Sequence, residues 1–337
     1  MIGRFLRTTW KRHFPPKLLG GMDMNKNILW IVLIGICQFL VSSNLHAVNR
    51  ESVGTSASKF LQLGVNARAI AMGEAYSAVS DGSDSIHWNP ARLALVEGKS
   101  LSLMHSVYLE TLFYDYGSYA QKIGSAGTLG VSMQYLSGSQ IDRTDALGSG
   151  VGTFNPYDLA LSAGWAFQFK DLGEGRKILL GISGKFIQSR IIQTATGGAV
   201  DAGFSFNLSR KLWFGFAVQN IGPSLKYNDK GDPLPLNVKL GSSYQLLESL
   251  LLAADVNSPR DNDLNVSLGA EVKKSIARDM WLAGRTGFNS RTTPDINGLS
   301  SISAGVGFGW QNYGVDFAWV PFGGLGHTYR VSLSAKF

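Results

Sequence analysis

Cysteine is almost absent from this chain of 337 residues, and charged residues are scarce. The only cysteine, Cys37, lies in an N-terminal apolar run that we expect to be removed, so the mature chain would have no disulfide or thiolate metal site. The residue before it, Ile36, is not small, which argues against a lipoprotein cut. Charged residues make up 16% of the chain, whereas about a quarter is usual in soluble domains.

The excess of positive charge does not indicate a nucleic-acid partner. The formal net charge is +7, but six basic residues and one acidic residue precede Val48, so this segment carries +5 and the remainder only +2. No basic stripe interleaved with aromatic residues occurs in that remainder, as a nucleic-acid surface would require.

Long apolar runs are also missing, apart from Ile28 to Val41. This run is shorter than the roughly 20 residues of a membrane-spanning helix. Lys26 precedes it, and a small residue, Ala47, follows at the expected cut. We therefore predict that residues 1–47 are an N-terminal extension and signal peptide, with an uncleaved anchor as the alternative. The segment from Met24 reads like a start, which would make residues 1–23 an extension.

Catalytic and metal-binding patterns are not found. The five histidines, His13, His46, His87, His105 and His327, include no pair at metal-ligand spacing. No serine nucleophile elbow or paired carboxylate accompanies His105 or His327. Alternate glycines in "GVGFG" (Gly305 to Gly309) fit a strand facing a lumen, not a phosphate loop. We expect no enzyme activity, no cofactor and no metal.

What is present is alternation at period two, from about residue 100 to the end. In "TLGVSMQY", Leu129, Val131 and Met133 occupy one face, and small or polar residues occupy the other. We count about 14 such segments, as in half-buried strands. Their approximate centres are Leu103, Ser118, Val131, Ala163, Gly184, Phe204, Phe216, Gly241, Ala254, Leu268, Gly284, Gly305, Phe317 and Leu333.

Connection lengths add an independent signal. Several connections after even-numbered segments are tight, such as Gln311 and Asn312, whereas those after odd-numbered segments are mostly long. This asymmetry is typical of outer-membrane barrels. We predict an all-β fold, an antiparallel transmembrane β-barrel over residues 100–337, with both termini in the periplasm. A soluble β-sandwich is the alternative, but the second face is rich in small residues, which suits a lumen better.

Charged residues fall on or near the predicted lumen face: Lys185, Lys239, Glu271, Arg285 and Asp316. Charges inside a membrane protein are often functional, but in a wet barrel they can also only solvate the lumen. The sequence leaves both readings open.

The chain ends on an alternating stretch, "TYRVSLSAKF". In a closed barrel the last strand must pair with the first, which removes the open edge. We expect Tyr329, Val331, Leu333, Ala335 and Phe337 to face lipid, and Arg330 and Lys336 to face the lumen or its rim. Tyr329, Val331, Leu333 and Phe337 resemble the signal read by the barrel assembly machinery, which we expect as a partner beside outer-membrane lipid.

Residues 48–99 do not alternate and are rich in small side chains, notably between Ala67 and Ala78. Pro90 marks a turn, because it holds Asn89 out of the helical region. The segment is either a periplasmic linker or a hatch packed inside the barrel.

The stretch from Leu63 to Ala94 resembles the N-terminal signature of the PorV/PorQ family, a branch of the FadL-like outer-membrane proteins. The family usually has glycine after Asn-Pro-Ala, whereas this chain has Arg92, which could reshape the turn or reach a carboxylate. The matching residues are Gly64, Ala67, Arg68, Ala71, Met72, Gly73, Ala75, Ala78, Val79, Asp81, Trp88, Asn89, Pro90 and Ala91.

The resemblance implies a 14-stranded barrel with an N-terminal hatch, in which Trp88, Asn89, Pro90, Ala91 and Arg92 form a binding or gating motif. It implies an accessory role in type IX secretion, with exported proteins or secretion components as partners. The FadL likeness implies, as an alternative, transport of a hydrophobic small molecule. A plain structural barrel or adhesin is a third possibility.

Overall fold

The computed structural model describes residues 53–108, 111–227, 230–292 and 300–337. The expected signal peptide and Cys37 lie outside these ranges. Within them, no helix is both long enough and apolar enough to cross a membrane. The described residues form one compact unit.

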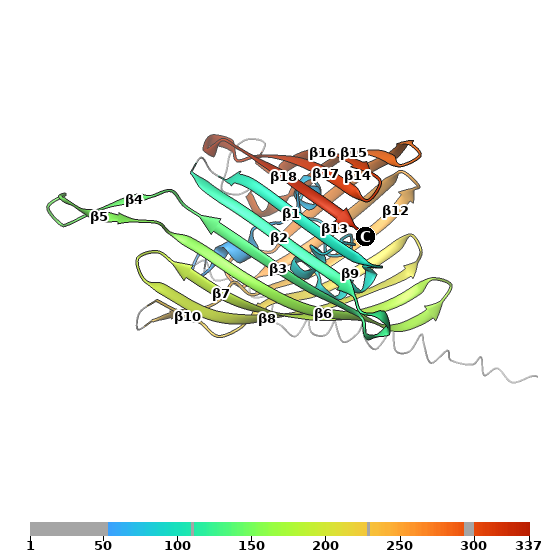
Figure 1. Ribbon diagram of the computed structural model, residues 1–337, viewed down its shortest axis with the longest axis horizontal. Helices are drawn as coiled ribbons and strands as arrows, with labels where there is room; N and C mark the ends of the chain where they lie inside the picture. The colour runs from blue at the N-terminus through green and yellow to red at the C-terminus, as the bar shows by residue number, and fades with distance from the viewer. Residues whose placement is uncertain (1–52, 109–110, 228–229, 293–299) are drawn as a thin grey trace, which may run out of the picture. The chain divides into compact units, whose positions relative to one another are not determined.

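Fourteen antiparallel strands close into a barrel (Figure 1). Every expected strand centre lies in one of them, so the predicted fold class and strand count are confirmed. The strands are β1 (Lys99–Tyr108), β2 (Leu112–Lys122), β3 (Thr128–Ser137), β6 (Tyr157–Gly173), β7 (Arg176–Arg190), β8 (Thr194–Ser209), β9 (Leu212–Ile221), β12 (Asn237–Leu247), β13 (Leu250–Pro259), β14 (Asn265–Ala277), β15 (Met280–Asn289), β16 (Ile302–Trp310), β17 (Tyr313–Pro321) and β18 (His327–Lys336).

The barrel closes where β18 pairs with β1. Leu333 lies opposite Leu103 in this seam. At its end, Lys99 N donates to Phe337 O and Phe337 N donates to Lys99 O, both at 2.9 Å. The C-terminal alternation therefore serves to remove the sheet edge, as expected.

Two connections that look middling in length in the sequence have tight turns in the structure. In the sequence, the connections after β6 and β14 look longer than a tight turn. In the structure, most of their residues belong to the flanking strands, and only two residues form each turn. In the β6–β7 turn, both Glu174 (φ 55°) and Gly175 (φ 78°) have positive φ, as the tightest hairpin turns require. We call this end of the barrel the short-turn end.

Two long connections contain hairpins that the sequence did not predict. Residues Ile141–Thr144 (β4) pair with Gly150–Phe154 (β5), and Leu225–Lys226 (β10) pair with Gly231–Asp232 (β11). The β4–β5 hairpin projects from the end of the barrel opposite the C-terminal residue (Figure 1).

Large apolar side chains cover the outer face of the wall. Leu129, Val131 and Met133 are 52%, 51% and 43% exposed. The C-terminal residues Tyr329, Val331, Leu333 and Phe337 are 44–61% exposed. Ala335 departs from the expectation, since it is only 6% exposed. It lies opposite Tyr313 in the register, and the rings of Tyr313 and Phe337 contact each other nearby. Such an outward apolar band suits lipid as the surrounding solvent.

The segment before β1 packs against the inner face of the wall, and we call residues 53–98 the plug. Its short helices are η2 (Lys59–Gln62), α2 (Ala67–Ala71), α3 (Ser85–Trp88) and η3 (Pro90–Leu95). Helix α2 contacts strands β15 to β18, and helix η3 contacts strands β6, β7 and β8. Most plug residues are buried.

Glycines in the wall let the plug backbone approach closely. A Cβ atom added to Gly287 on β15 would lie 1.9 Å from the nitrogen of Gly73 in the plug. The glycines of "GVGFG" are inward positions, as expected. Added Cβ atoms would meet Ala71 at Gly305, the Arg285 and Asp316 side chains at Gly307, and the Trp281 ring at Gly309.

Candidate functional site

The Asn-Pro turn of the plug is fixed by one side chain. Asn89 has an extended backbone (φ −158°), as a residue before proline prefers. Its Oδ1 accepts from the nitrogen of Ala91 at 3.2 Å and so caps η3. Its Nδ2 donates to the carbonyls of Ser77 and Phe204, both at 3.1 Å. Asn89 thus joins two plug segments to β8.

Trp88 forms the centre of the plug core. It is fully buried, and its Nε1 donates to the carbonyl of Val65 at 3.2 Å. The Tyr76 ring packs edge-on against it, and the ammonium of Lys239 lies 4.6 Å from the Trp88 ring centre. Burial, together with nearby Lys239 and Lys185, holds the pKa of His87 well below its usual value, so this plug histidine is neutral.

Of the two alternatives that the sequence left open for Arg92, an ion pair with a carboxylate is not found among the described residues. Its Nε donates to the carbonyl of Ser80 at 2.6 Å and its Nη1 to Ser205 Oγ at 3.2 Å. Its guanidinium lies 4.9 Å from the ring centre of Trp213. The Asp81 carboxylate of the plug pairs with Arg68 and Lys336, each at 3.4 Å.

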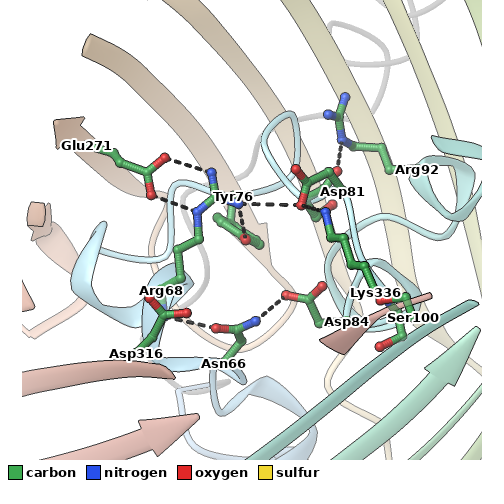
Figure 2. Close-up of polar contacts among 12 residues, drawn as sticks. Asn66, Arg68, Tyr76, Asp81, Asp84, Arg92, Ser100, Glu271, Asp316 and Lys336 are labelled. Atoms are coloured by element: carbon green, nitrogen blue, oxygen red, sulfur yellow. Dashed lines mark hydrogen bonds and ion pairs between the residues drawn. The ribbon is translucent and has the colours of Figure 1, made fainter. Parts of the chain in front are cut away.

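A chain of ion pairs holds the plug to the wall, and we call it the latch (Figure 2). Arg68 of α2 donates from Nε and Nη2 to Glu271 on β14, at 2.7 and 2.8 Å. Glu271 also accepts from Arg285 on β15 at 2.6 Å, and Arg285 donates to Asp316 on β17 at 2.6 Å. Glu271, Arg285 and Asp316 were expected on the lumen face, but the pairing of Glu271 with Arg68 had no signal in the sequence.

Further wall side chains bind the plug backbone. Asp255 Oδ2 on β13 accepts from the nitrogens of Tyr76 and Ser77, at 3.2 and 2.9 Å. Asn289 Nδ2 on β15 donates to the carbonyl of Gly73 at 3.2 Å. The plug is therefore tied to the wall through β8, β13, β14 and β15.

A polar cavity of about 240 Å³ opens beside the latch near the C-terminal residues. Asp84 lines it, is 3% exposed, and accepts from Asn66 Nδ2 at 2.8 Å (Figure 2). Asp84 belongs to the plug, outside the membrane-spanning strands. Burial, with a contribution from the neighbouring Asp81, raises the pKa of Asp84 to about 6.

Two cavities between plug and wall are small, at about 40 and 30 Å³. An apolar cavity that binds benzene measures about 150 Å³. In the described ranges, no group of three or more His, Cys, Asp or Glu side chains is placed to hold a metal ion. The arrangement secures a plug in a barrel.

The family model of the type IX secretion system protein PorV matches residues 46–257. The chain belongs to the PorV family. No curated protein matches it at a significant level. The resemblance inferred from Leu63 to Ala94 is therefore confirmed, and this member of the PorV family is an outer-membrane β-barrel.

Solved structures share the fold at low identity. The toluene transporter TodX of Pseudomonas putida is 13% identical, with 81% of this chain and 99% of that chain covered and a TM-score of 0.56. The toluene transporter TbuX of Ralstonia pickettii (14%, 81% and 98%, 0.51) and a FadL homologue of Pseudomonas aeruginosa (10%, 81% and 98%, 0.51) are also similar. Family and fold are those of secretion and transport barrels.

Proposed function

We propose that this PorV-family barrel is an accessory protein of type IX secretion that receives exported proteins at its long-loop end and passes them to the surface-attachment machinery. The observation that carries this proposal, beside the family match, is the fastened plug. With the plug tied to strands around the barrel, among them β8, β13, β14 and β15, and with cavities of about 240, 40 and 30 Å³ between plug and wall, exported proteins have no ready route through the barrel. The contacts with cargo then lie on the outside.

In this proposal the short-turn end and both termini face the periplasm, and the long connections face the cell surface. The β4–β5 hairpin offers a protein-binding surface there, because Ile141, Leu147 and Val151 are 45%, 91% and 52% exposed on it. Exposed apolar groups on a projecting hairpin favour contact with another protein.

The test replaces residues 141–154 with a short Gly-Ser linker in the producing cell. We expect exported proteins to be lost from the culture supernatant, while the barrel stays heat-modifiable in the outer-membrane fraction. The control replaces residues 230–232 of the smaller hairpin, all exposed, and is expected to secrete normally. Normal secretion by a strain that lacks the whole gene would refute the proposal.

Transport of a hydrophobic small molecule is the second candidate. The likeness to toluene transporters favours it, as does a largely apolar groove of about 630 Å³ on the outer wall, lined by Leu252, Leu268 and Phe288 among others. This role would require the plug to move. Uptake of labelled toluene and of a labelled fatty acid by the gene-deleted strain separates the candidates, since lost uptake with unchanged secretion supports transport alone.

A further inference from the structure

One of the small cavities between plug and wall, of about 40 Å³, lies near the long connections. We call it the arginine cavity, because Arg291 and Arg330 both line it. Arg330 belongs to β18 and faces the lumen, and Arg291 belongs to η5 (Ser290–Thr292), which directly follows β15. A single buried water needs roughly 10–15 Å³. The arginine cavity therefore has room for a small ion but not for an extended ligand.

Arg330 is a buried cation with an unused donor. It is 3% exposed, its Nη1 donates to the carbonyl of Gly64 in the plug at 3.3 Å, and its guanidinium lies 5.8 Å from the Tyr108 ring centre. Among the described residues, its Nε has no hydrogen-bond acceptor, and no carboxylate lies within ion-pair distance of it. A charge buried without a counter-charge is costly, so this guanidinium favours an anion beside it.

The surroundings of Arg330 carry more positive than negative charge. The one carboxylate in the lining of the arginine cavity, that of Glu74, already pairs with Arg291 at 3.1 Å. Glu74 and Arg291 also line the cavity of about 30 Å³, together with Lys239, which is 7% exposed. Asp255 attracts Lys239 as well, but it lines neither cavity. The two linings together hold three cations and one carboxylate, a net charge of +2 (3 − 1).

We propose that the arginine cavity binds a small inorganic monoanion, of the size of chloride, which accepts from Arg330 Nε. Hydrogen bonds between an ionised donor and an anion are among the strong ones in proteins. The anion supplies the missing counter-charge between β18 and the plug, and so fastens the plug in addition to the latch. This site is independent of the proposed role in secretion.

The direct test is a crystal structure of the mature protein in sodium bromide, with diffraction data collected at the bromine absorption edge. We expect an anomalous peak in the arginine cavity, within hydrogen-bond distance of Arg330 Nε. The variant Arg330→Gln should lose this peak. The matched control, Lys211→Gln, removes one cation from the exposed β8–β9 turn, which does not line the cavity, and should keep the peak.

A second measurement compares thermal unfolding in detergent with sodium chloride and with sodium gluconate at equal concentration, because gluconate is too large for the cavity. An ion that binds only the folded protein stabilises it. We therefore expect the parent protein and Lys211→Gln to melt roughly 2–4 °C higher in chloride, and Arg330→Gln to melt at the same temperature in both salts. If Arg330→Gln does not fold, the bromide peak and the chloride effect of the parent protein decide the outcome.

Three results overturn the proposal. A parent protein without the bromide peak, which melts equally in both salts, would show that water and the chain alone solvate Arg330. A peak without any effect of chloride on melting would mark an adventitious ion only. An effect of chloride that Arg330→Gln retains in full would place the anion elsewhere on the protein.

Discussion

Arg68 of the plug and Glu271 of β14 form a two-pronged ion pair, with both guanidinium nitrogens within 2.8 Å of the carboxylate oxygens. The Glu271 side chain is 4% exposed and that of its second partner, Arg285, is 1% exposed. Removal of one member from such a buried set leaves a charge without a partner, which costs more than the intact pair contributes.

Glu271→Gln is therefore expected to loosen the plug. The variant leaves Arg68 and Arg285 facing a neutral amide, at a cost of about 3–5 kcal/mol for a broken buried pair. Hydrogen exchange of residues 67–79 should speed up, while exchange in β3 on the wall stays slow. Glu248→Gln, in the exposed β12–β13 turn, is the control. Unchanged exchange in the plug would show that the latch does not hold it.

Gly287→Ala is expected to displace the plug, whereas Gly284→Ala on the same strand is expected to be neutral. The added methyl group at residue 287 would meet the Gly73 backbone at 1.9 Å, but residue 284 has nothing within 4 Å. Overpacking of this kind costs about 1–3 kcal/mol. Thermal unfolding in detergent measures both variants, and equal melting temperatures would contradict the close packing.

Asp84→Asn is expected to stabilise the protein above pH 6. Because the folded-state pKa of Asp84, about 6, exceeds the ordinary 3.8, the folded protein holds this proton more tightly than the unfolded chain. The contribution of Asp84 to stability therefore falls as the pH rises from about 4 to about 6. The melting temperature of the parent protein should therefore fall between about pH 4 and about pH 6, and the variant should lack this fall.

The control for this change is Asp279→Asn in an exposed turn. The pKa of Asp84 also depends on Arg68, Lys336, Asp81 and Asn66. The melting temperature of the variant is therefore compared with that of the parent protein at each pH. If the melting temperature of Asp84→Asn changed with pH in parallel with that of the parent protein, Asp84 would not be the group that titrates.

Phe337→Ala is expected to lower the yield of assembled barrel severalfold if the C-terminal residues form the signal read by the assembly machinery. Phe308→Ala, at another outward aromatic position, should assemble normally. The heat-modifiable fraction in outer membranes measures both. Comparable yields would indicate that Phe337 is only a lipid-facing residue.

The C-terminal strand illustrates how much of the fold could be predicted from sequence. Its period-two pattern is local, because successive side chains of a strand point to opposite faces. The same rule located all fourteen barrel strands and the inward glycines of "GVGFG". The signature around Asn89 likewise indicated the family.

By itself, then, the sequence determined the approximate strand number, the alternation of faces along the strands and the family. Only the tertiary structure decided which charges meet. Arg68 and Glu271 are 203 residues apart, and no local pattern specifies such a pair. The sequence left open whether Arg92 reaches a carboxylate, and only the structure shows that it donates to the Ser80 carbonyl and the Ser205 hydroxyl. Contacts across a closed barrel depend on how the sheet curves and on the path of the plug, which local periodicity does not encode.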